Sequence, residues 1–173
     1  MEGERAYIGI GSNLGDRIDN CKRAIGAVSH LSGVKGLVAS SLYETAPVAP
    51  ASGAWFVNGV ASMETTLPPG ALLGELQRIE RAMGRPASTA RGEDRSIDLD
   101  LLLVGSQVVE QPDLVLPHPR LHLRRFVLAP LCELAPDLRH PVLGLTMRQL
   151  LECLNDPSPV RLLAGAISPA PAG

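Results

Sequence analysis

The order of strand-like and helix-like segments constrains the fold of this chain more than any other feature. Apolar alternation predicts strands at residues 6–10, 37–43 and 56–64, and a longer apolar run predicts a fourth at 96–104. Helical spacing of apolar residues predicts one helix after the first strand and another, opening at Pro68 and Pro69, before the fourth. This order is that of a ferredoxin-like α+β fold, in which an antiparallel sheet carries helices on one face.

The rest of the chain adds smaller elements to this plan. The fourth predicted strand is the most apolar, so we expect it in the centre of the sheet. Short strands are predicted near 107–109 and 114–116, and helices at 126–134 and 146–154. Residues 1–155 are expected to form one domain, and the Pro-, Ala- and Ser-rich tail of residues 156–173 to be loosely held.

Charge and composition disfavour several classes of protein. A formal net charge of −2 gives no general attraction to nucleic acid or to an anionic membrane. No apolar run approaches the ~18 residues that cross a bilayer, and the first residues lack a signal-peptide pattern. Cys21, Cys132 and Cys153 are widely spaced, and we expect buried free thiols. These features favour the cytoplasm.

The run RSIDLDLLL, residues 95–103, carries the clearest chemical signal. Residues two apart on a strand share a face, so Asp98 and Asp100 are expected to point the same way. The opposite face would take Ile97, Leu99, Leu101 and Leu103. Neighbouring carboxylates repel each other, and a divalent cation such as Mg²⁺ relieves that repulsion. The alternative is a pair of acids on a solvated face, which is more typical of an edge strand.

Arginines are concentrated directly before the two aspartates. They are Arg78, Arg81, Arg85, Arg91 and Arg95. Guanidinium groups bind phosphate oxygens through paired hydrogen bonds, and arginines beside a metal site are typical of phosphoryl transfer. Arg78 and Arg81 have a simpler explanation, because cations near the C-terminal end of a helix suit its dipole.

Three further features are weaker signals. The chain has only one Trp, two Tyr and two Phe. Phe56 and Phe126 could hold a flat ligand between their rings, although a Phe is more often a core residue. His118, between prolines in LPHPR, is either a donor to phosphate or a structural hydrogen-bonding residue. GIGSNLG lacks the ending of a P-loop and is interpreted as a tight turn.

Six motifs in a fixed order resemble the 6-hydroxymethyl-7,8-dihydropterin pyrophosphokinase family of folate biosynthesis. They are YIGIGSNLGDR, SSLYETAPV, FVNGV, QRIERAMGR, RSIDLDLLL, and LPHPR followed by RRFVL. The resemblance covers residues 7–154. It implies a Mg²⁺-dependent kinase with ATP as co-substrate, which transfers the β,γ-diphosphate to the pterin and releases AMP. It also implies a monomer whose partners are these small molecules, with no nucleic acid and no membrane.

The resemblance further implies roles for single residues. Asp98 and Asp100 would bind two Mg²⁺ ions between the triphosphate and the pterin hydroxyl, and Arg85 and Arg95 would be the catalytic arginines. The residues implied for the pterin are Thr45, Pro47, Val48, Phe56, Asn58 and Phe126. Those implied for ATP are Gln77, Glu80, Arg85, Arg91, Arg95, Leu101, Val115, His118 and Arg124.

Some positions depart from residues found in other members of that family. Gly92 replaces a Trp, Ala87 an Arg, Phe56 a Tyr, Pro119 a Tyr and Ser96 a Thr. The first two fall in the loop of residues 85–94, which with residues 45–53 is the candidate lid over ATP.

Two other functions remain open from the sequence. An RNA-binding module on the same plan would need aromatic residues on an exposed sheet face and a basic surface. An inactive relative would bind pterin or nucleotide without turnover, and the presence of both aspartates and both arginines argues against it.

Overall fold

A computed structural model describes residues 2–46, 55–84 and 96–165 of the 173-residue chain. The elements are, in chain order, β1 (Glu4–Ser12), α1 (Arg17–Ser29), β2 (Val34–Ala39), β3 (Leu42–Thr45), β4 (Phe56–Thr65), α2 (Pro69–Ala82), β5 (Asp98–Val104), β6 (Val109–Gln111), β7 (Leu114–Leu116), the 3-10 turn Leu121–Leu123, α3 (Arg125–Leu134), α4 (Met147–Cys153) and β8 (Val160–Ala164).

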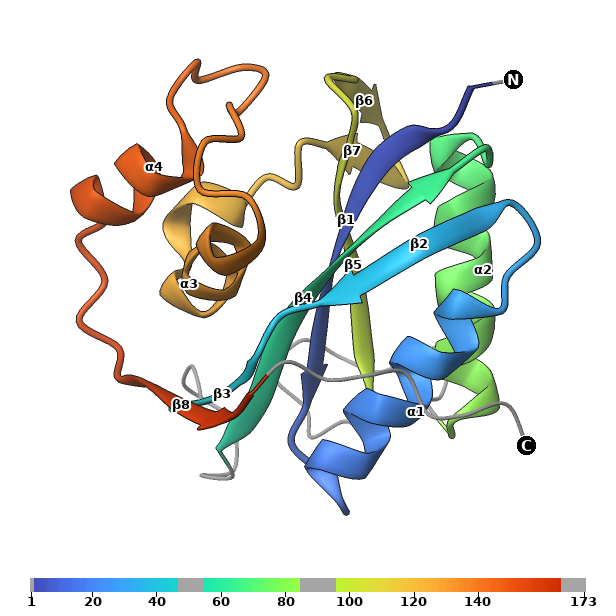
Figure 1. The fold of residues 1–173 in the computed structure, drawn as a ribbon, viewed down its shortest axis with the longest axis horizontal. Coiled ribbons are helices and arrows are strands. Elements are labelled where there is room, and N and C mark those ends of the chain that lie inside the picture. The colour runs from blue at the N-terminus through green and yellow to red at the C-terminus, as the bar shows by residue number, and fades with distance from the viewer. Residues whose placement is uncertain (1, 47–54, 85–95, 166–173) are drawn as a thin grey trace.

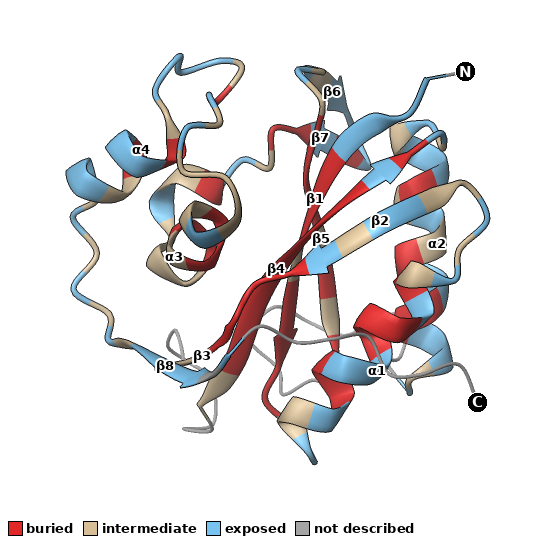
Figure 2. Ribbon diagram, in the orientation of Figure 1, coloured by how far each residue is buried: buried red, intermediate tan, exposed pale blue. Residues whose placement is uncertain are grey.

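The main sheet has the strand order β5-β1-β4-β3-β8, with β2 also paired to β4, and every pairing among the described strands is antiparallel. Helices α1 and α2 lie on one face, as predicted (Figure 1). The opposite face is covered by α3 and α4, which the sequence reasoning did not anticipate. As a result, the central strands are buried for most of their length (Figure 2). The ferredoxin-like arrangement is therefore confirmed, with an additional layer.

The helices begin and end where local chemistry favours it. Asp16 caps α1 by accepting a hydrogen bond from the backbone N–H of Asp19 at 3.0 Å. Pro69 opens α2, and Gly84, at φ +94°, follows its end. Thr146 and Gln149 form a reciprocal capping box at the start of α4. None of the described helices has both the length and the apolar character needed to cross a bilayer.

The prediction that the fourth strand is central was wrong. This strand, β5, lies at the end of the strand order, and β1, β4 and β3 are the inner strands. It is apolar because both of its faces are covered: Leu99 and Leu101 pack toward α1 and α2, and Leu102 packs toward α3. Burial of its two faces, and not a central position, therefore explains its composition.

A β-bulge also changes the expected side-chain alternation. The register between β1 and β5 shifts where Tyr7 pairs with Leu103 and Ile8 pairs with Leu101. Leu102 is the extra residue, and both Leu102 and Leu103 join the apolar cluster on the α3 side. Leu103 was predicted on the other face, and that prediction was wrong.

The single strand predicted at residues 37–43 is two strands separated by Ser40 and Ser41. The side-chain oxygen of Ser40 accepts a hydrogen bond from the backbone N–H of Val60 at 2.9 Å, in place of a backbone carbonyl.

The tail expected to be loosely held also forms β8, which pairs with β3. Of the cysteines, Cys21 is buried, but Cys153 is exposed at the end of α4, against expectation.

Candidate active site

The two aspartates lie at one end of the sheet, on the face that α3 covers. Gly11, near the end of β1, pairs with Asp98 on one side and with Asn58 on the other. Directly paired residues of an antiparallel sheet share a face, so these three positions form one row across three strands. The row lies where β1 ends and where β4 and β5 begin.

A second row, two residues along the strands, shows which face of the sheet carries the aspartates. Gly9 pairs with Asp100 and with Val60, and Val60 packs in the apolar cluster that includes α3. Asp98 and Asp100 are both half-buried and point to this side. The residue between them, Leu99, is buried toward α2. The shared face predicted for the two aspartates is therefore confirmed.

Gly9 and Gly11 of β1 place no side chain on this face beside the carboxylates of Asp98 and Asp100. A Cβ added to Gly11 would lie 2.8 Å from Asn58 Oδ1, closer than such contacts allow, and 3.9 Å from the ring of Phe56. At Gly9 the nearest atoms would be at 3.6 and 3.7 Å, in Leu102 and Asp100. Gly11 is thus required for the close approach of Asn58 to the β1 backbone.

Asn58 is held in a defined orientation. Its Nδ2 donates a 2.6 Å hydrogen bond to Thr45 Oγ1, and both residues are buried. The side-chain carbonyl of Asn58 therefore lies over Gly11. Phe56, half-buried, is two residues before Asn58 on β4 and on the same face. The structure thus brings together three of the residues implied for the pterin.

Helix α3 supplies Phe126 on the same side of the sheet. Phe126 is half-buried against the α3 cluster, and the Arg124 guanidinium lies 5.3 Å from the centre of its ring. Arg124 is also the residue that precedes the first turn of α3. Phe126 and Arg124, implied for the pterin and for ATP respectively, are therefore neighbours.

Glu133, near the end of α3, fixes the helix to β3. Its carboxylate accepts hydrogen bonds from the Ser41 N–H and hydroxyl at 2.8 and 2.7 Å and from the Tyr43 hydroxyl at 2.6 Å. Partial burial opposes ionisation of Glu133, but the hydrogen bonds from Tyr43 and Ser41 prevail and lower its pKa. Burial, together with the bond to Glu133, raises the pKa of Tyr43.

The residues implied for ATP occupy positions of different kinds. Glu80 is buried on α2, and its Oε1 accepts a 2.8 Å hydrogen bond from the backbone N–H of Leu99, between the two aspartates. The Leu101 side chain is buried in the core, so only its backbone can meet a ligand. Gln77 and Val115 are exposed.

His118 lies beside β5. Its backbone N–H donates to the Leu102 carbonyl at 2.9 Å, and its Nδ1 accepts from the Arg120 N–H at 3.2 Å. An accepting Nδ1 places the proton of the neutral ring on Nε2, which makes that atom a donor. His118 therefore has both a structural hydrogen bond and a donor atom suited to phosphate.

Several predictions fall outside the described residues. They concern Pro47, Val48, Arg85, Arg91, Arg95 and the candidate lid at 45–53 and 85–94, of which only Thr45 and Ala46 are described. The simpler explanation for the helix arginines agrees with the structure: Arg78 forms an ion pair with Glu75, and Arg81 lies in the last turn of α2.

Gly9 and Gly11 are the site residues that the sequence reasoning missed. Glycine at every second position of a strand marks a bare face, and GIG at residues 9–11 carried that signal. The tight turn predicted at GIGSNLG is only partly right, because Gly9 to Ser12 belong to β1 and the turn follows them. In that turn Gly15 has φ +71°, and the Asn20 amide donates to the Leu14 carbonyl at 2.9 Å.

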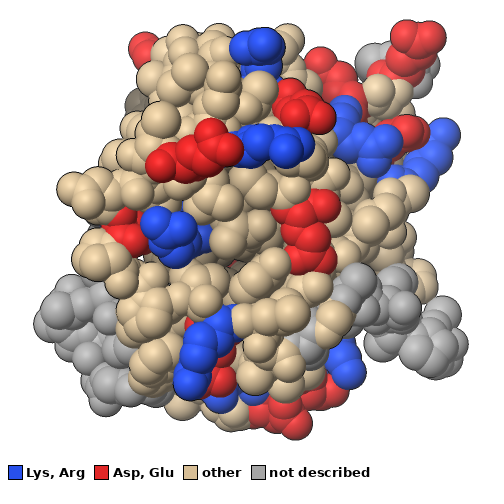
Figure 3. Space-filling model, turned by 60° about the vertical axis from the view of Figure 1, so that its left-hand side comes forward, with Lys and Arg blue, Asp and Glu red and all other residues tan. Residues whose placement is uncertain are grey.

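The donor set around the aspartates is small. No cluster of three or more His, Cys, Asp or Glu that could hold a metal occurs within the part of the chain that the structure describes. Two carboxylates suit Mg²⁺, which takes one or two of them and completes its shell with water and phosphate oxygens. On the face shown in Figure 3, acidic and basic side chains are intermixed.

Comparison with known proteins decides the family. A sequence profile described as 7,8-dihydro-6-hydroxymethylpterin-pyrophosphokinase (HPPK) matches residues 7–136. The chain belongs to the HPPK family. It is 43% identical over 136 residues to the 2-amino-4-hydroxy-6-hydroxymethyldihydropteridine pyrophosphokinase of Haemophilus influenzae. That match covers 79% of this chain and 84% of the Haemophilus protein.

Other HPPK relatives are longer proteins. The folic acid synthesis protein fol1 of Pneumocystis carinii is 40% identical over 156 residues, or 90% of this chain but 21% of that protein. A crystal structure of wild-type Plasmodium falciparum HPPK-DHPS with pteroate matches with a TM-score of 0.66 at 16% identity, over 88% of this chain and 42% of that one. At that identity the structural match supports the fold alone.

Proposed function

We propose that this chain transfers the β,γ-diphosphate of ATP to the hydroxymethyl group of 6-hydroxymethyl-7,8-dihydropterin, giving AMP and the pterin diphosphate for folate biosynthesis. The observation that carries the proposal is the half-buried pair Asp98 and Asp100, beside the glycine-lined face that also bears Asn58 and Phe56. Membership of the HPPK family supports the same reaction.

Asp98 and Asp100 are proposed to hold two Mg²⁺ ions. Their partners across the strand pair are Gly11 and Gly9, so no β1 side chain covers the carboxylates. Bound there, Mg²⁺ supplies charge neutralisation for the triphosphate and lowers the pKa of the pterin alcohol. The strand geometry of β5 keeps both carboxylates on one side, which orients them toward a shared ligand.

The pterin is proposed to lie between Phe56 and Phe126. Both rings are half-buried on the same side of the sheet, as stacking on a flat heterocycle requires. Asn58 gives its amide N–H to Thr45, so its carbonyl is the atom that would accept from the amino and ring N–H groups of the pterin. Pro47 and Val48 are proposed to add backbone contacts to that edge.

ATP is proposed to bind along β5 and the residues beside it. Glu80 fixes the backbone of β5 at Leu99, and the next N–H directed away from β1 belongs to Leu101, which would bind the nucleotide through its backbone. His118 Nε2 and the Arg124 guanidinium would bind phosphate oxygens, with Gln77, Glu80 and Val115 toward the nucleoside. Arg91 completes the proposed ATP set.

The chemistry is an in-line displacement at the β-phosphorus. The pterin oxygen forms a bond to that phosphorus, the bond to the oxygen shared with the α-phosphorus breaks, and AMP leaves with the electron pair. The hydroxyl proton leaves to water. The residues of this chain hold the two substrates in line, and Arg85 and Arg95 are proposed to stabilise the charge on the transferring group.

The test is AMP formation by the purified chain from ATP, Mg²⁺ and 6-hydroxymethyl-7,8-dihydropterin, resolved by chromatography. Asp98→Asn should lower turnover by at least about a hundredfold, because each such electrostatic contact is worth about 3–4 kcal/mol in the transition state. Asp137→Asn, at an exposed ion pair on another part of the surface, is the matched control and should keep wild-type turnover. Release of ADP in place of AMP would refute the proposed reaction.

We also propose that the chain works as a monomer in the cytoplasm without nucleic acid. Light scattering coupled to size exclusion should give the mass of one chain, 18.3 kDa, with and without substrates. A dimer mass, or coelution with RNA, would contradict this part of the proposal.

A further inference from the structure

The last described residues connect two parts of the proposed pterin site that are distant in sequence. The segment of residues 155–164, which we name the C-terminal strap, leaves α4 and ends as β8 beside β3 (Figure 1). It begins well after residue 136, where the match to the HPPK profile ends. It is anchored at both ends of its course.

The first anchor is Asp156 at the start of α3. Its Oδ2 accepts a 3.1 Å hydrogen bond from the backbone N–H of Arg125, and its own carbonyl accepts from Arg125 Nε at 3.2 Å. Ser158 donates its backbone N–H to Asp156 Oδ1 at 2.9 Å. Although burial opposes ionisation, hydrogen bonds from Ser158 and Arg125 lower the Asp156 pKa. Asp156 thus satisfies an N–H that the first helical turn leaves open, next to Phe126.

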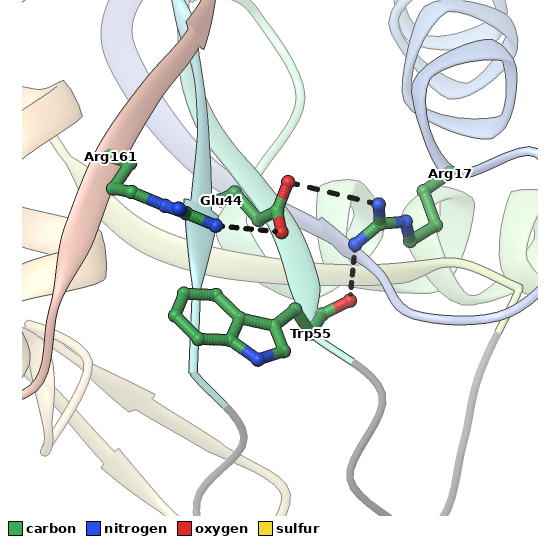
Figure 4. Close-up of polar contacts among 4 residues, drawn as sticks. All are labelled: Arg17, Glu44, Trp55 and Arg161. Carbon is green, nitrogen blue, oxygen red and sulfur yellow. Dashed lines mark hydrogen bonds and ion pairs between the residues drawn. The ribbon is translucent and has the colours of Figure 1, made fainter.

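The second anchor is Arg161 on β8, in a cluster of four residues shown in Figure 4. Glu44 lies between two guanidinium groups: Arg161 at 3.3 Å and Arg17 at 3.8 Å. Arg17 also donates a 2.7 Å hydrogen bond to the Trp55 carbonyl, and Arg161 lies 4.8 Å from the centre of the Trp55 ring.

This cluster lies next to the pterin residues in the chain. Glu44 immediately precedes Thr45, and Trp55 immediately precedes Phe56. Successive strand residues point to opposite faces, so the cluster occupies the reverse side of the sheet from Thr45 and Phe56. Holding Glu44 and Trp55 therefore fixes the backbone from which both pterin residues project.

We propose that the C-terminal strap is a structural part of the pterin site, with Asp156 and Arg161 as positioning residues. Asp156 fixes the turn that carries Phe126, and Arg161 fixes the strand ends that carry Thr45 and Phe56. In this way the strap fixes the distance between the start of α3, which carries Phe126, and the strand ends that carry Thr45 and Phe56. This inference rests on the proposed function, because it takes the ligand between these sides to be the pterin.

The expected effect is moderate and specific. Arg161 is largely exposed, and an exposed ion pair combined with a cation–π contact supports a loss of about three- to tenfold in pterin affinity. Arg161 contacts Glu44 and Trp55, neither of which is proposed to bind ATP, so its replacement should leave nucleotide affinity unchanged. Asp156 holds the residue next to Arg124, which is proposed to bind phosphate, so its replacement should weaken nucleotide binding as well.

The experiment is calorimetric binding of 6-hydroxymethylpterin to the full chain, with Mg²⁺ and a non-hydrolysable ATP analogue, for Asp156→Ala and Arg161→Gln. Pterin Kd should rise about three- to tenfold in each, and in Arg161→Gln the Kd of the analogue should not change. Arg161→Lys should recover part of the loss by restoring the ion pair. Arg148→Gln, which removes an exposed pair with Asp137, is the matched control and should bind as wild type.

Trp55 gives an independent readout, because it is the only tryptophan of the chain. Its emission should shift in Arg161→Gln but not in Arg148→Gln. Wild-type pterin Kd in a variant whose emission has shifted would overturn the inference. In Arg161→Gln, equal weakening of pterin and nucleotide would also overturn it, as general destabilisation. Tight pterin binding without AMP formation would instead refute the proposed function while leaving this test valid.

Discussion

Replacing Gly11 by Ala tests the geometry of the site at a single atom. The new Cβ would lie 2.8 Å from Asn58 Oδ1, so the Asn58 side chain must move. That movement breaks or distorts its 2.6 Å hydrogen bond to Thr45, in a buried environment. Leaving a buried polar group unsatisfied costs about 1–3 kcal/mol. If that cost falls on the bound conformation, pterin affinity drops by about five- to 150-fold.

The assay is the KM for pterin at saturating ATP, with circular dichroism to confirm the fold. Gly9→Ala, on the same strand and face, places its Cβ at ordinary contact distances of 3.6 Å or more and should be far milder. Gly74→Ala, which meets nothing within 4 Å in α2, should leave KM unchanged and stabilise the helix. The double variant with Asn58→Ala should lose no more than Asn58→Ala alone. A Gly11→Ala enzyme with wild-type KM would refute the reasoning.

Three further predictions concern stability, measured by urea unfolding. Glu80→Ala should lower the free energy of unfolding by about 1–3 kcal/mol because it leaves the Leu99 N–H without its acceptor, whereas Glu80→Gln, which keeps an acceptor, should cost less; equal losses would contradict this. The lowered pKa of Glu133 contributes stability above the unfolded-state pKa of about 4.3, so the difference between wild type and Glu133→Gln should shrink as pH falls through the lower, folded-state pKa, and a constant difference would count against it. Burial, with a smaller contribution from His122, lowers the pKa of His140, whose Nδ1 accepts from the Val142 and Leu143 N–H groups. Stability should therefore fall as pH drops below about 6.5, and His140→Asn should flatten that dependence; an unchanged slope would show that another group titrates.

The local features of the fold could be predicted from the sequence because each has a local cause. The period of the apolar residues predicted α1 and α2, and Pro69 marked the start of α2. The shared face of Asp98 and Asp100 follows from the strand period alone. That alternation fails at Leu103, because the bulge at Leu102 depends on pairing with β1.

Features set by distant contacts could not be predicted in this way. The apolar composition of β5 indicates that both of its faces are buried, but it does not indicate its place in the sheet. The strand β8 is short and buries little apolar surface, as the 67% exposure of Leu162 shows. The formation of β8 therefore depends on its pairing with β3. The hydrogen bond that Glu80 accepts from the Leu99 N–H joins residues 19 apart in the chain, and no periodicity of the sequence indicates it.

Asp98 and Asp100 are proposed to bring the triphosphate and the pterin together on the α3 side of the sheet. A crystal structure with Mg²⁺, a non-hydrolysable ATP analogue and 6-hydroxymethylpterin would show where each ligand binds. We expect cations on both carboxylates, the pterin between Phe56 and Phe126, and the β-phosphorus in line with its hydroxyl. A triphosphate bound on the α1 and α2 side, away from both aspartates, would contradict this proposal.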